Sequence, residues 1–376
     1  MAYTESFPVC ERLIHLNHAA VGPWPARTLE AVSRFAQENV RQGSLGYPRW
    51  LRVQQHLRDT IRNLINASSS DEIALVKNTS EGLSMIAAGL DWQHGDNIVG
   101  IRQEFPSNRV VWQSLEPQGV RFRQLDLAAS IDPEQGLFGL CDERTRMIAV
   151  SAVQYADGFR LDLERIGRFC REQGILFCVD AIQHIGALPF DVQAIQADFT
   201  VADGHKWMLA PEGLGLFYVR RAVLSQLRPS QFGWHMMQPI DDYAQDHFEV
   251  ARSARRYECG SPNMLGIMAL VSSLEVLLEH GMQRVGSDLQ THVQRLIEGL
   301  QAIPGVELLT DTSPDRLSGI VTFRHPSLAS KAIQQQLLQQ DILCAERGGG
   351  VRLSPHYYLP PSHIDQSLQV IEDCLR

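Results

Sequence analysis

Between residues 72 and 219, short apolar runs alternate with helical patterns, and this alternation limits the chain to few folds. Strands separated by helices need crossover connections, which produce a mainly parallel sheet with helices on both faces. The runs lack strict alternation with polar residues, as expected for strands buried on both faces. The predicted strands are 72–76, 97–101, 147–150, 175–179, 198–202 and 216–219, and the predicted helices are 80–89, 107–117 and 162–173.

The pattern changes after about residue 260, where long helical patterns dominate. Helices are predicted at 263–281, 284–302, 330–340 and 363–375, with strands at 318–323 and 350–353. We therefore predict a large α/β domain over 17–258 and a small α+β domain formed by 1–16 plus 259–376.

Composition excludes several classes of partner. Of the 376 residues, 44% are hydrophobic and 20% are charged, which is enough apolar material for a sizeable core. The formal net charge of −9 repels phosphate backbones, so we expect no nucleic acid partner. The seven cysteines form no Cys-x-x-Cys pair and do not suggest a disulfide scaffold. Because neither a signal-peptide pattern nor an apolar stretch of about 20 residues is present, we expect a cytoplasmic protein without membrane contact.

Other chemistries lack their signatures. No carboxylate–histidine cluster has the spacing of a metal site, so no metal is expected. Gly213-x-Gly215 precedes a strand and does not follow one, which does not fit the glycine-rich loop of a nicotinamide enzyme. A DNA-binding sensor would need a further domain, for which the chain offers no room.

Ligands of open α/β sheets bind beyond the carboxyl ends of the strands, so the residues that follow each strand are informative. Thr79 and Ser80 open a helix, where they could hold a phosphate or simply cap the helix. Phe105 could lie over a flat ring or belong to the core. Tyr155 could donate a hydrogen bond to a ligand or occupy a turn.

Two strand ends give stronger signals. Asp180 ends an apolar strand, where a carboxylate is costly unless a group such as a protonated ring nitrogen pairs with it. Gln183, one helical turn later, points the same way; the alternative is a helix-capping aspartate. Lys206 lies between a histidine and a tryptophan, and burial would lower its pKa and make its amine a usable nucleophile.

These residues belong to a longer series of motifs. In chain order the sequence contains Thr79-Ser80-Glu81-Gly82, Asp180-x-x-Gln183, Gly204-His205-Lys206-Trp207, Gly260-Ser261-Pro262 and Arg352-x-Ser354-Pro355-His356. The set resembles the class V aminotransferase group of fold-type I pyridoxal phosphate enzymes. That group includes cysteine desulfurases, kynureninase, cysteine C-S lyases and isopenicillin N epimerase-like proteins. The resemblance extends from Leu16 to near Tyr358 and implies a mainly parallel sheet of the seven-stranded type between helices.

The resemblance implies roles for individual residues. Lys206 is similar to the lysine that holds pyridoxal phosphate as a Schiff base and then serves as base at the substrate α-carbon. Asp180 is similar to the carboxylate that keeps the ring nitrogen protonated. The other implied ligands are Gln183 and Tyr155 at the phenolic oxygen, Phe105 against the ring, Thr79, Ser80 and His205 at the phosphate, Ser261 at the phosphate of the other subunit of a homodimer, Arg352 at the substrate α-carboxylate, and Asn17 and His18 at the substrate mouth.

Three positions differ from the pattern of desulfurases. Phe105 stands where they usually have histidine. Asp203 stands where they often have a hydroxyl that holds the phosphate, and since a carboxylate repels phosphate, we expect it to point elsewhere or to bind a backbone group. Cys344 lies only 8 residues before Arg352 (352 − 344) and ends an apolar run, so we expect a core residue and not a reactive cysteine.

The sequence therefore predicts a homodimeric pyridoxal phosphate enzyme that acts on a small amino acid. A class V aminotransferase is the leading expectation. A cysteine or cystine C-S lyase or an epimerase-like enzyme is the alternative, and a catalytically silent cofactor-binding scaffold is the third. The substrate side chain stays open.

Overall fold

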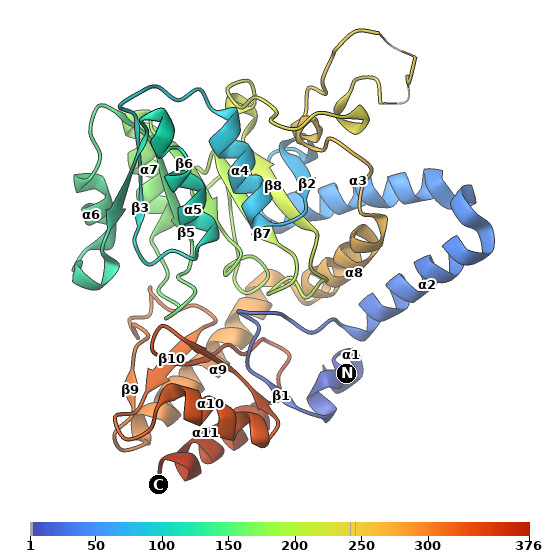
Figure 1. Cartoon of the computed structure of the whole chain (residues 1–376). Helices are drawn as coiled ribbons and strands as arrows, with labels where there is room; N and C mark the ends of the chain where they lie inside the picture. The colour runs from blue at the N-terminus through green and yellow to red at the C-terminus, as the bar shows by residue number, and fades with distance from the viewer. Residues whose placement is uncertain (1–2, 241, 245) are drawn as a thin grey trace.

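A computed structural model describes residues 3–240, 242–244 and 246–376, and its central element is a seven-stranded sheet (Figure 1). The strands lie in the order β2 (Ile73–Val76), β8 (Gly215–Val219), β7 (Phe199–Asp203), β6 (Leu176–Asp180), β5 (Thr145–Ser151), β3 (Asn97–Ile101) and β4 (Arg121–Leu125). β8 is antiparallel to both of its neighbours, and the other pairs are parallel. The predicted fold class is confirmed.

Both faces of this sheet are buried by helices. Alternate residues of one strand enter two different cores: Cys178 packs with α4 (Thr79–Gly89) and α5 (Ser107–Gln113), while Phe177 and Val179 pack with α7 (Leu163–Gln173). This double burial is the reason that the strands read as unbroken apolar runs. α7 begins at Asp162, which caps it, and ends at Gly174, whose φ of 68° is the left-handed conformation that glycine adopts easily.

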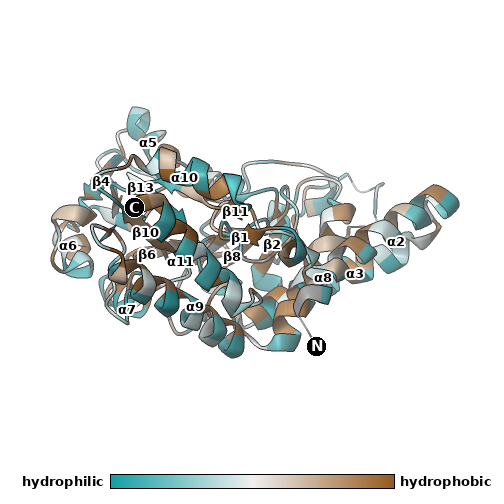
Figure 2. Cartoon of the chain, turned by 90° about the horizontal axis from the view of Figure 1, so that it is seen from below, coloured by the Kyte–Doolittle hydropathy of each residue, from teal (hydrophilic) through white to brown (hydrophobic). Residues whose placement is uncertain are grey.

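Two long helices, α2 (Ala26–Gln42) and α3 (Tyr47–Leu64), extend away from the sheet as an arm (Figures 1 and 2). α8 (Met264–His280) packs against both of them. The arm carries exposed apolar side chains, including Leu29, Val40 and Leu45. It was not predicted from the sequence.

The C-terminal part contains a four-stranded antiparallel sheet, called the C-terminal sheet below. Its order is β12 (Ala345–Arg347), β13 (Gly350–Leu353), β10 (Val321–Arg324) and β9 (Glu307–Leu308). The helices in this part are α9 (Met282–Ala302), α10 (Ser330–Gln339) and α11 (Pro361–Leu375), while α1 (Tyr3–Ser6) and α6 (Pro133–Gly139) are short.

The N-terminal residues join the C-terminal part, since β1 (Ile14–His15) pairs with β11 (Ile342–Leu343). The boundary at residue 259 stays a prediction, because α8, which follows it, packs on the arm. Among the described residues no single helix is long and apolar enough to span a membrane. In the same described part of the chain, one pair of helices, α8 and α9, meets this criterion together, but the two are bent by 81° relative to each other.

Candidate active site

A cavity of about 280 Å³ lies at the ends of β3, β5, β6 and β7 and the start of α4. This is the edge of the sheet at which the sequence places a ligand site. Most of the predicted site residues line it: Thr79, Ser80, Phe105, Tyr155, Asp180, Gln183, His205, Lys206 and Arg352.

Lys206 lies in the turn after β7, and only 9% of its surface is exposed. Burial lowers the pKa of its amine to about 8, although the charge of Asp180 raises it. The turn packs so closely against Gly22 that a Cβ there would come within 2.2 Å of the Lys206 carbonyl oxygen. Gly22 also donates its N–H to the carbonyl of His205 at 2.8 Å. The lysine is therefore held firmly, and its amine deprotonates easily.

Asp180 ends β6, opposite Ser151 of β5, and is 2% exposed. Its carboxylate accepts the N–H of Ile182 at 3.1 Å, and no salt bridge joins it to any residue that the structure describes. Burial raises the pKa of this carboxyl to about 6. A buried carboxylate without an ionic partner is stabilised by a cation in the cavity, such as a protonated ring nitrogen.

The start of α4 faces the cavity. Asn78 caps the helix by accepting the N–H of Glu81 at 2.9 Å. The Oγ1 of Thr79 and the Nδ1 of His205 are buried and have no hydrogen-bond partner among the described residues. Ser80 donates its hydroxyl to that of Ser107 at 2.9 Å. Unpaired buried polar atoms at a helix N-terminus fit an anion such as phosphate.

Asp203 does not behave as expected. Asp203 is among the residues that line the cavity, and its buried Oδ1 lies 3.1 Å from Nδ1 of His205. The contact lacks hydrogen-bond geometry, so both atoms count as unpaired. No hydrogen bond joins the Asp203 side chain to a backbone group of the described residues, so the expectation of a backbone partner is wrong.

Phe105 and Tyr155 form an aromatic wall of the cavity. Their ring centroids are 5.2 Å apart at 79°, and Nζ of Lys206 lies 5.6 Å from the centroid of Phe105. Because the Phe105 side chain is 44% exposed, it does not belong to the core and is free to stack on a flat ligand.

Gln183 is fixed at both ends of its amide. Its Oε1 accepts the indole N–H of Trp207 at 2.8 Å, and its Nε2 donates to the carbonyl of Ala19 at 3.0 Å. The side chain thereby ties the end of β6 to the lysine turn and presents its remaining N–H group beside the cavity.

Two arginines, Arg347 and Arg352, also line the cavity. Arg352 of β13 is 2% exposed and donates from Nη1 to the carbonyl of Tyr155 at 2.6 Å, while its Nε is unpaired. Burial and the neighbouring Arg347 lower the pKa of Arg352 to about 10. Arg347 is exposed, donates to the carbonyl of Glu346, and has no carboxylate partner among the described residues. The pair fits carboxylate groups of a ligand.

Three predicted residues lie outside the cavity. His18 is fully buried, and its two ring nitrogens are bound to the carbonyl of Ser354 at 2.8 Å and the hydroxyl of Tyr358 at 2.7 Å, so it does not line the mouth as expected. Asn17 next to it is likewise absent from the lining, with its Oδ1 buried and unpaired. Ser261 is exposed and lies outside the cavity of its own chain.

The structure also brings residues to the cavity that were not predicted from the sequence. Arg347 lies five residues before Arg352, outside the motif that contains that arginine, and was not predicted as a site residue. Ser151 was not predicted as a site residue, because a small polar residue at the end of a strand gives no distinct signal. The remaining polar side chains of the lining are Asn78, Ser107 and Glu212. Within the described part of the chain, no group of three or more His, Cys, Asp or Glu residues is arranged to hold a metal ion.

Fold and site together define a fold-type I pyridoxal phosphate enzyme. The family model of class-V aminotransferases matches residues 14–355, and the chain belongs to that family. A probable cysteine desulfurase of Methanothermobacter thermautotrophicus is 30% identical, over 97% of this chain and 96% of that protein. A probable cysteine desulfurase of Pyrococcus abyssi is 27% identical, over 99% and 96%.

Solved structures show the same fold. The apo cysteine desulfurase of Thermococcus onnurineus NA1 has a TM-score of 0.88 and 23% identity, and the alignment covers 100% of this chain and 99% of that one. The cystine C-S lyase C-DES, solved with its product cysteine persulfide, has a TM-score of 0.91 and 24% identity, with 98% and 99% covered.

The residues present fit the cofactor of this family. The buried unpaired atoms of Thr79 and His205 suit a phosphate, and the buried acid of Asp180 suits a cationic ring nitrogen. The exposed ring of Phe105 suits stacking, and the amine of Lys206 suits a bond to an aldehyde. Two further carboxylates, Asp203 and Glu212, also line the cavity, and Asp203 has an imidazole beside it.

Proposed function

We propose that this enzyme is a C–S lyase that cleaves a small sulfur-containing amino acid, cystine or cysteine, with pyridoxal phosphate. The observation that carries this proposal is the lack of a thiol at the site: within the described residues, no cysteine lines the cavity. The aminotransferase that the sequence favours is supported at the level of the family only, while the named relatives act on cysteine or cystine.

A desulfurase that stores sulfur on its own cysteine needs that thiol near the substrate. Here β12 and β13 are joined directly, with Arg347 opposite Gly350 and with Gly348 and Gly349 at positive φ in the turn. This tight hairpin leaves no loop that could carry a thiol to the cavity. Cys344 is 3% exposed, and burial raises its pKa to about 12, so its thiolate is scarcely available. A lyase releases the sulfur to solution and needs no such group.

Five groups of residues would hold the cofactor, each at a different part of it. Lys206 would bind its aldehyde, Asp180 would pair with the ring nitrogen, and Phe105 would stack on the ring. Thr79, Ser80, His205 and the N-terminus of α4 would hold the phosphate, while Gln183 and Tyr155 would contact the phenolic oxygen. When bound, the cofactor supplies an electron sink for the bond that breaks at the substrate Cα.

The chain itself moves the proton. The amine of Lys206, with a pKa near 8, would serve as the base that accepts the proton of the substrate Cα. The C–S bond then breaks, and its electron pair leaves with sulfur. With one water, cystine yields pyruvate, ammonia and cysteine persulfide; cysteine yields pyruvate, ammonia and sulfide.

The two arginines favour cystine. Arg352 would bind the α-carboxylate with its planar guanidinium. Arg347 places a second cation at the same cavity, and no described carboxylate neutralises it. Cystine brings a second carboxylate at the far end of its disulfide, which would provide that partner.

Product analysis tests this proposal. Purified enzyme loaded with cofactor should convert cystine to pyruvate and ammonia in equal amounts, without a keto acid co-substrate. A desulfurase would instead release alanine, an aminotransferase would need a keto acid and make a new amino acid, and an epimerase would return the d-isomer. Cys344→Ala should keep full activity in the lyase and lose it in a desulfurase.

We also propose that the enzyme is a homodimer with shared sites. Ser261 is exposed and absent from the cavity of its own chain, and the neighbouring arm carries exposed apolar side chains that a second copy would cover. Glu258, three residues earlier, is anchored by Arg58 at 2.7 Å and by the N–H of Leu75 at 2.9 Å. This segment is therefore held rigidly at the surface, as a contribution to a partner's site requires.

A further inference from the structure

The turn that carries Tyr155 is bonded to the C-terminal sheet through its backbone. Each carbonyl from residue 155 to residue 158 accepts a hydrogen bond from a side chain of the C-terminal part. We call these four bonds the 155–158 ladder. The donors, in order, are Arg352 Nη1 to Tyr155 at 2.6 Å, Thr322 Oγ1 to Ala156 at 2.7 Å, Thr310 Oγ1 to Asp157 at 2.6 Å and Ser318 Oγ to Gly158 at 2.7 Å.

The ladder is built on the strand next to the substrate arginine. Thr322 of β10 lies directly opposite Arg352 of β13, and Thr322 is fully buried. Its N–H donates to Oγ1 of Thr310 at 2.8 Å, which links two donors of the ladder to each other. One hydrogen bond of the 155–158 ladder thus comes from Arg352 itself, and the adjacent one comes from its cross-strand neighbour Thr322.

The turn has little freedom to move away from these donors. Gly158 has a φ of 81°, and a Cβ there would lie 2.6 Å from the carbonyl oxygen of Ile320. Only glycine fits this position, so the turn packs directly onto the backbone of the C-terminal part.

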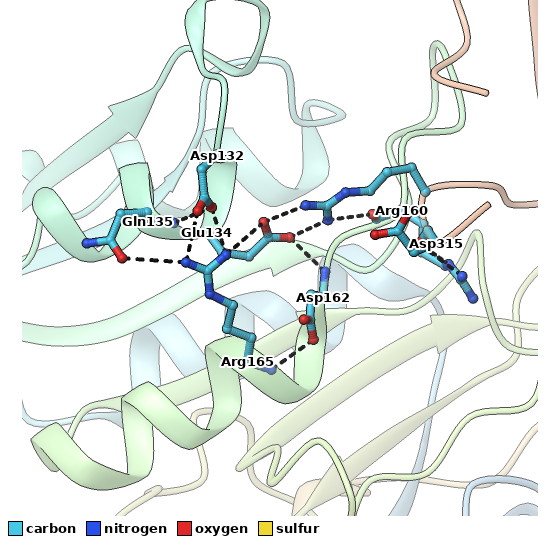
Figure 3. Close-up of polar contacts among 8 residues, drawn as sticks. Asp132, Glu134, Gln135, Arg160, Asp162, Arg165 and Asp315 are labelled. Atoms are coloured by element: carbon cyan, nitrogen blue, oxygen red, sulfur yellow. Dashed lines mark hydrogen bonds and ion pairs between the residues drawn. The ribbon is translucent and has the colours of Figure 1, made fainter. Parts of the chain in front are cut away.

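A buried ion pair holds the adjacent segment. Glu134, which is fully buried, accepts Nη1 and Nη2 of Arg316 at 2.6 and 2.8 Å and the N–H of Asp162 at 2.8 Å (Figure 3). Arg160 donates from its guanidinium to the carbonyl of Asp315 (Figure 3). These contacts attach residues 315 and 316 to α6 and α7, so the ladder does not serve as the main attachment between the two parts.

We propose that Thr322 is a positioning residue for the substrate carboxylate: its bond to the Ala156 carbonyl fixes the Tyr155 turn, and the turn in turn fixes the guanidinium of Arg352. Within the described residues, the guanidinium of Arg352 makes a single hydrogen bond, to the Tyr155 carbonyl, so its orientation depends on where that carbonyl lies. Thr322 itself is not among the residues that line the cavity.

This inference rests on the proposed role of Arg352 but not on the fate of the C–S bond. The test compares Thr322→Val, which keeps the shape and removes the hydroxyl, with Thr322→Ser, which restores it. Thr60→Val is the matched control, because Thr60 is also buried and donates to a backbone carbonyl, that of His56 at 2.8 Å, on the distant helix α3.

The first readout is substrate binding, followed by the absorbance of the bound cofactor during titration with cystine. Loss of one hydrogen bond of ordinary net strength predicts about a fivefold weaker apparent affinity in Thr322→Val. KM should rise by a similar factor with little change in kcat, Thr322→Ser should restore binding, and Thr60→Val should bind like the wild type. Cofactor affinity should be equal in all four proteins.

The second readout is independent of activity. In cofactor-free protein, deuterium uptake over residues 155–161 should increase in Thr322→Val and not in Thr60→Val. If Thr322→Val binds cystine as tightly as Thr60→Val while Arg352→Lys binds it weakly, the role of Thr322 is refuted and that of Arg352 stands. If Arg352→Lys also binds normally, the carboxylate assignment under the proposed function is wrong, and the inference is refuted with it.

Discussion

Glu104 binds Ser151, the residue directly opposite Asp180 in the central sheet. The N–H of Ser151 donates to Oε1 of Glu104 at 2.7 Å, its hydroxyl donates to Oε2, and Gln154 donates to Oε1 at 3.2 Å. Burial raises the pKa of Glu104 to about 7, and the negative charge of Asp180 adds to this effect. Two buried acids, Asp180 at the cavity and Glu104 bound to Ser151, therefore repel each other, and the stability of the protein without cofactor should depend on pH.

Both acids should destabilise the cofactor-free protein as pH rises. An acid whose pKa is raised in the folded state keeps its proton longer there than in the unfolded chain. Between the ordinary carboxyl range and about pH 6 for Asp180, the folded state holds more protons, so the free energy of unfolding falls as pH rises. Asp180→Asn should remove this loss and stabilise the cofactor-free protein at pH 8 by up to about 3 kcal/mol, with no gain at pH 4.

Urea unfolding at both pH values measures this difference. Asp373→Asn, at an exposed aspartate of α11, is the matched control and should change stability equally little at either pH. If Asp180→Asn does not raise the free energy of unfolding at pH 8, burial does not destabilise the charged form of this carboxylate. The same variant should bind cofactor weakly, because the partner of the ring nitrogen is lost.

The amine of Lys206 should set the pH dependence of cofactor uptake. Since burial lowers its pKa to about 8, the neutral amine becomes the major form above that value. The rate at which cofactor-free protein takes up pyridoxal phosphate should rise up to about pH 8 and then level off. An ordinary lysine would give a rate that still increases at pH 10.

Stopped-flow absorbance measures the rate, and borohydride reduction followed by mass spectrometry locates the bond. Lys206→Ala should show neither the absorbance nor the reduced adduct. Lys331→Ala, at an exposed lysine of α10, should behave like the wild type. An adduct retained in Lys206→Ala would disprove the assignment.

Arg347 should distinguish cystine from smaller substrates. If its guanidinium binds the second carboxylate, Arg347→Gln should raise KM for cystine about tenfold and leave KM for cysteine nearly unchanged, since hydrogen bonds between charged groups contribute about 1.5–3 kcal/mol. Arg352→Gln should weaken the binding of both substrates. Arg284→Gln, at an exposed arginine of α9, serves as control. An equal loss for cystine and cysteine in Arg347→Gln would contradict the preference for cystine.

The sequence located the cavity because its chemistry sits where strands end. Asp180 and Lys206 follow apolar runs, so both their position and their burial could be predicted. A similar signal is present at Glu104, a carboxylate three residues after the strand 97–101, but no role was predicted for it. The structure shows that this residue binds the next strand over, a contact between positions 47 residues apart that no local pattern reports.

Other features could not be predicted for physical reasons. α2 has a polar composition with exposed Leu29 and Val40, and its packing on α8, a helix much later in the chain, is not visible in a local pattern. His18 resembled a ligand-binding histidine, but its two nitrogens are bound by Ser354 and Tyr358, more than 330 residues away. The 155–158 ladder uses backbone carbonyls as acceptors, and these are invisible in a sequence.

Mixed dimers provide the test of shared sites. Ser261→Ala homodimers should bind cofactor about tenfold more weakly, because a phosphate loses one charge-assisted hydrogen bond from the neighbouring subunit. Lys206→Ala homodimers should be inactive.

In a mixed dimer, the subunit with the intact lysine receives the intact Ser261 of its partner, so one site is complete and the other is inactive. The mixture should therefore regain wild-type cofactor affinity at about half of the wild-type activity per dimer, measured after separating the species by affinity tags. Light scattering should show two chains per particle for every variant. A fully active monomer, or a mixed dimer whose affinity equals that of the Ser261→Ala homodimer, would mean that each chain completes its own site.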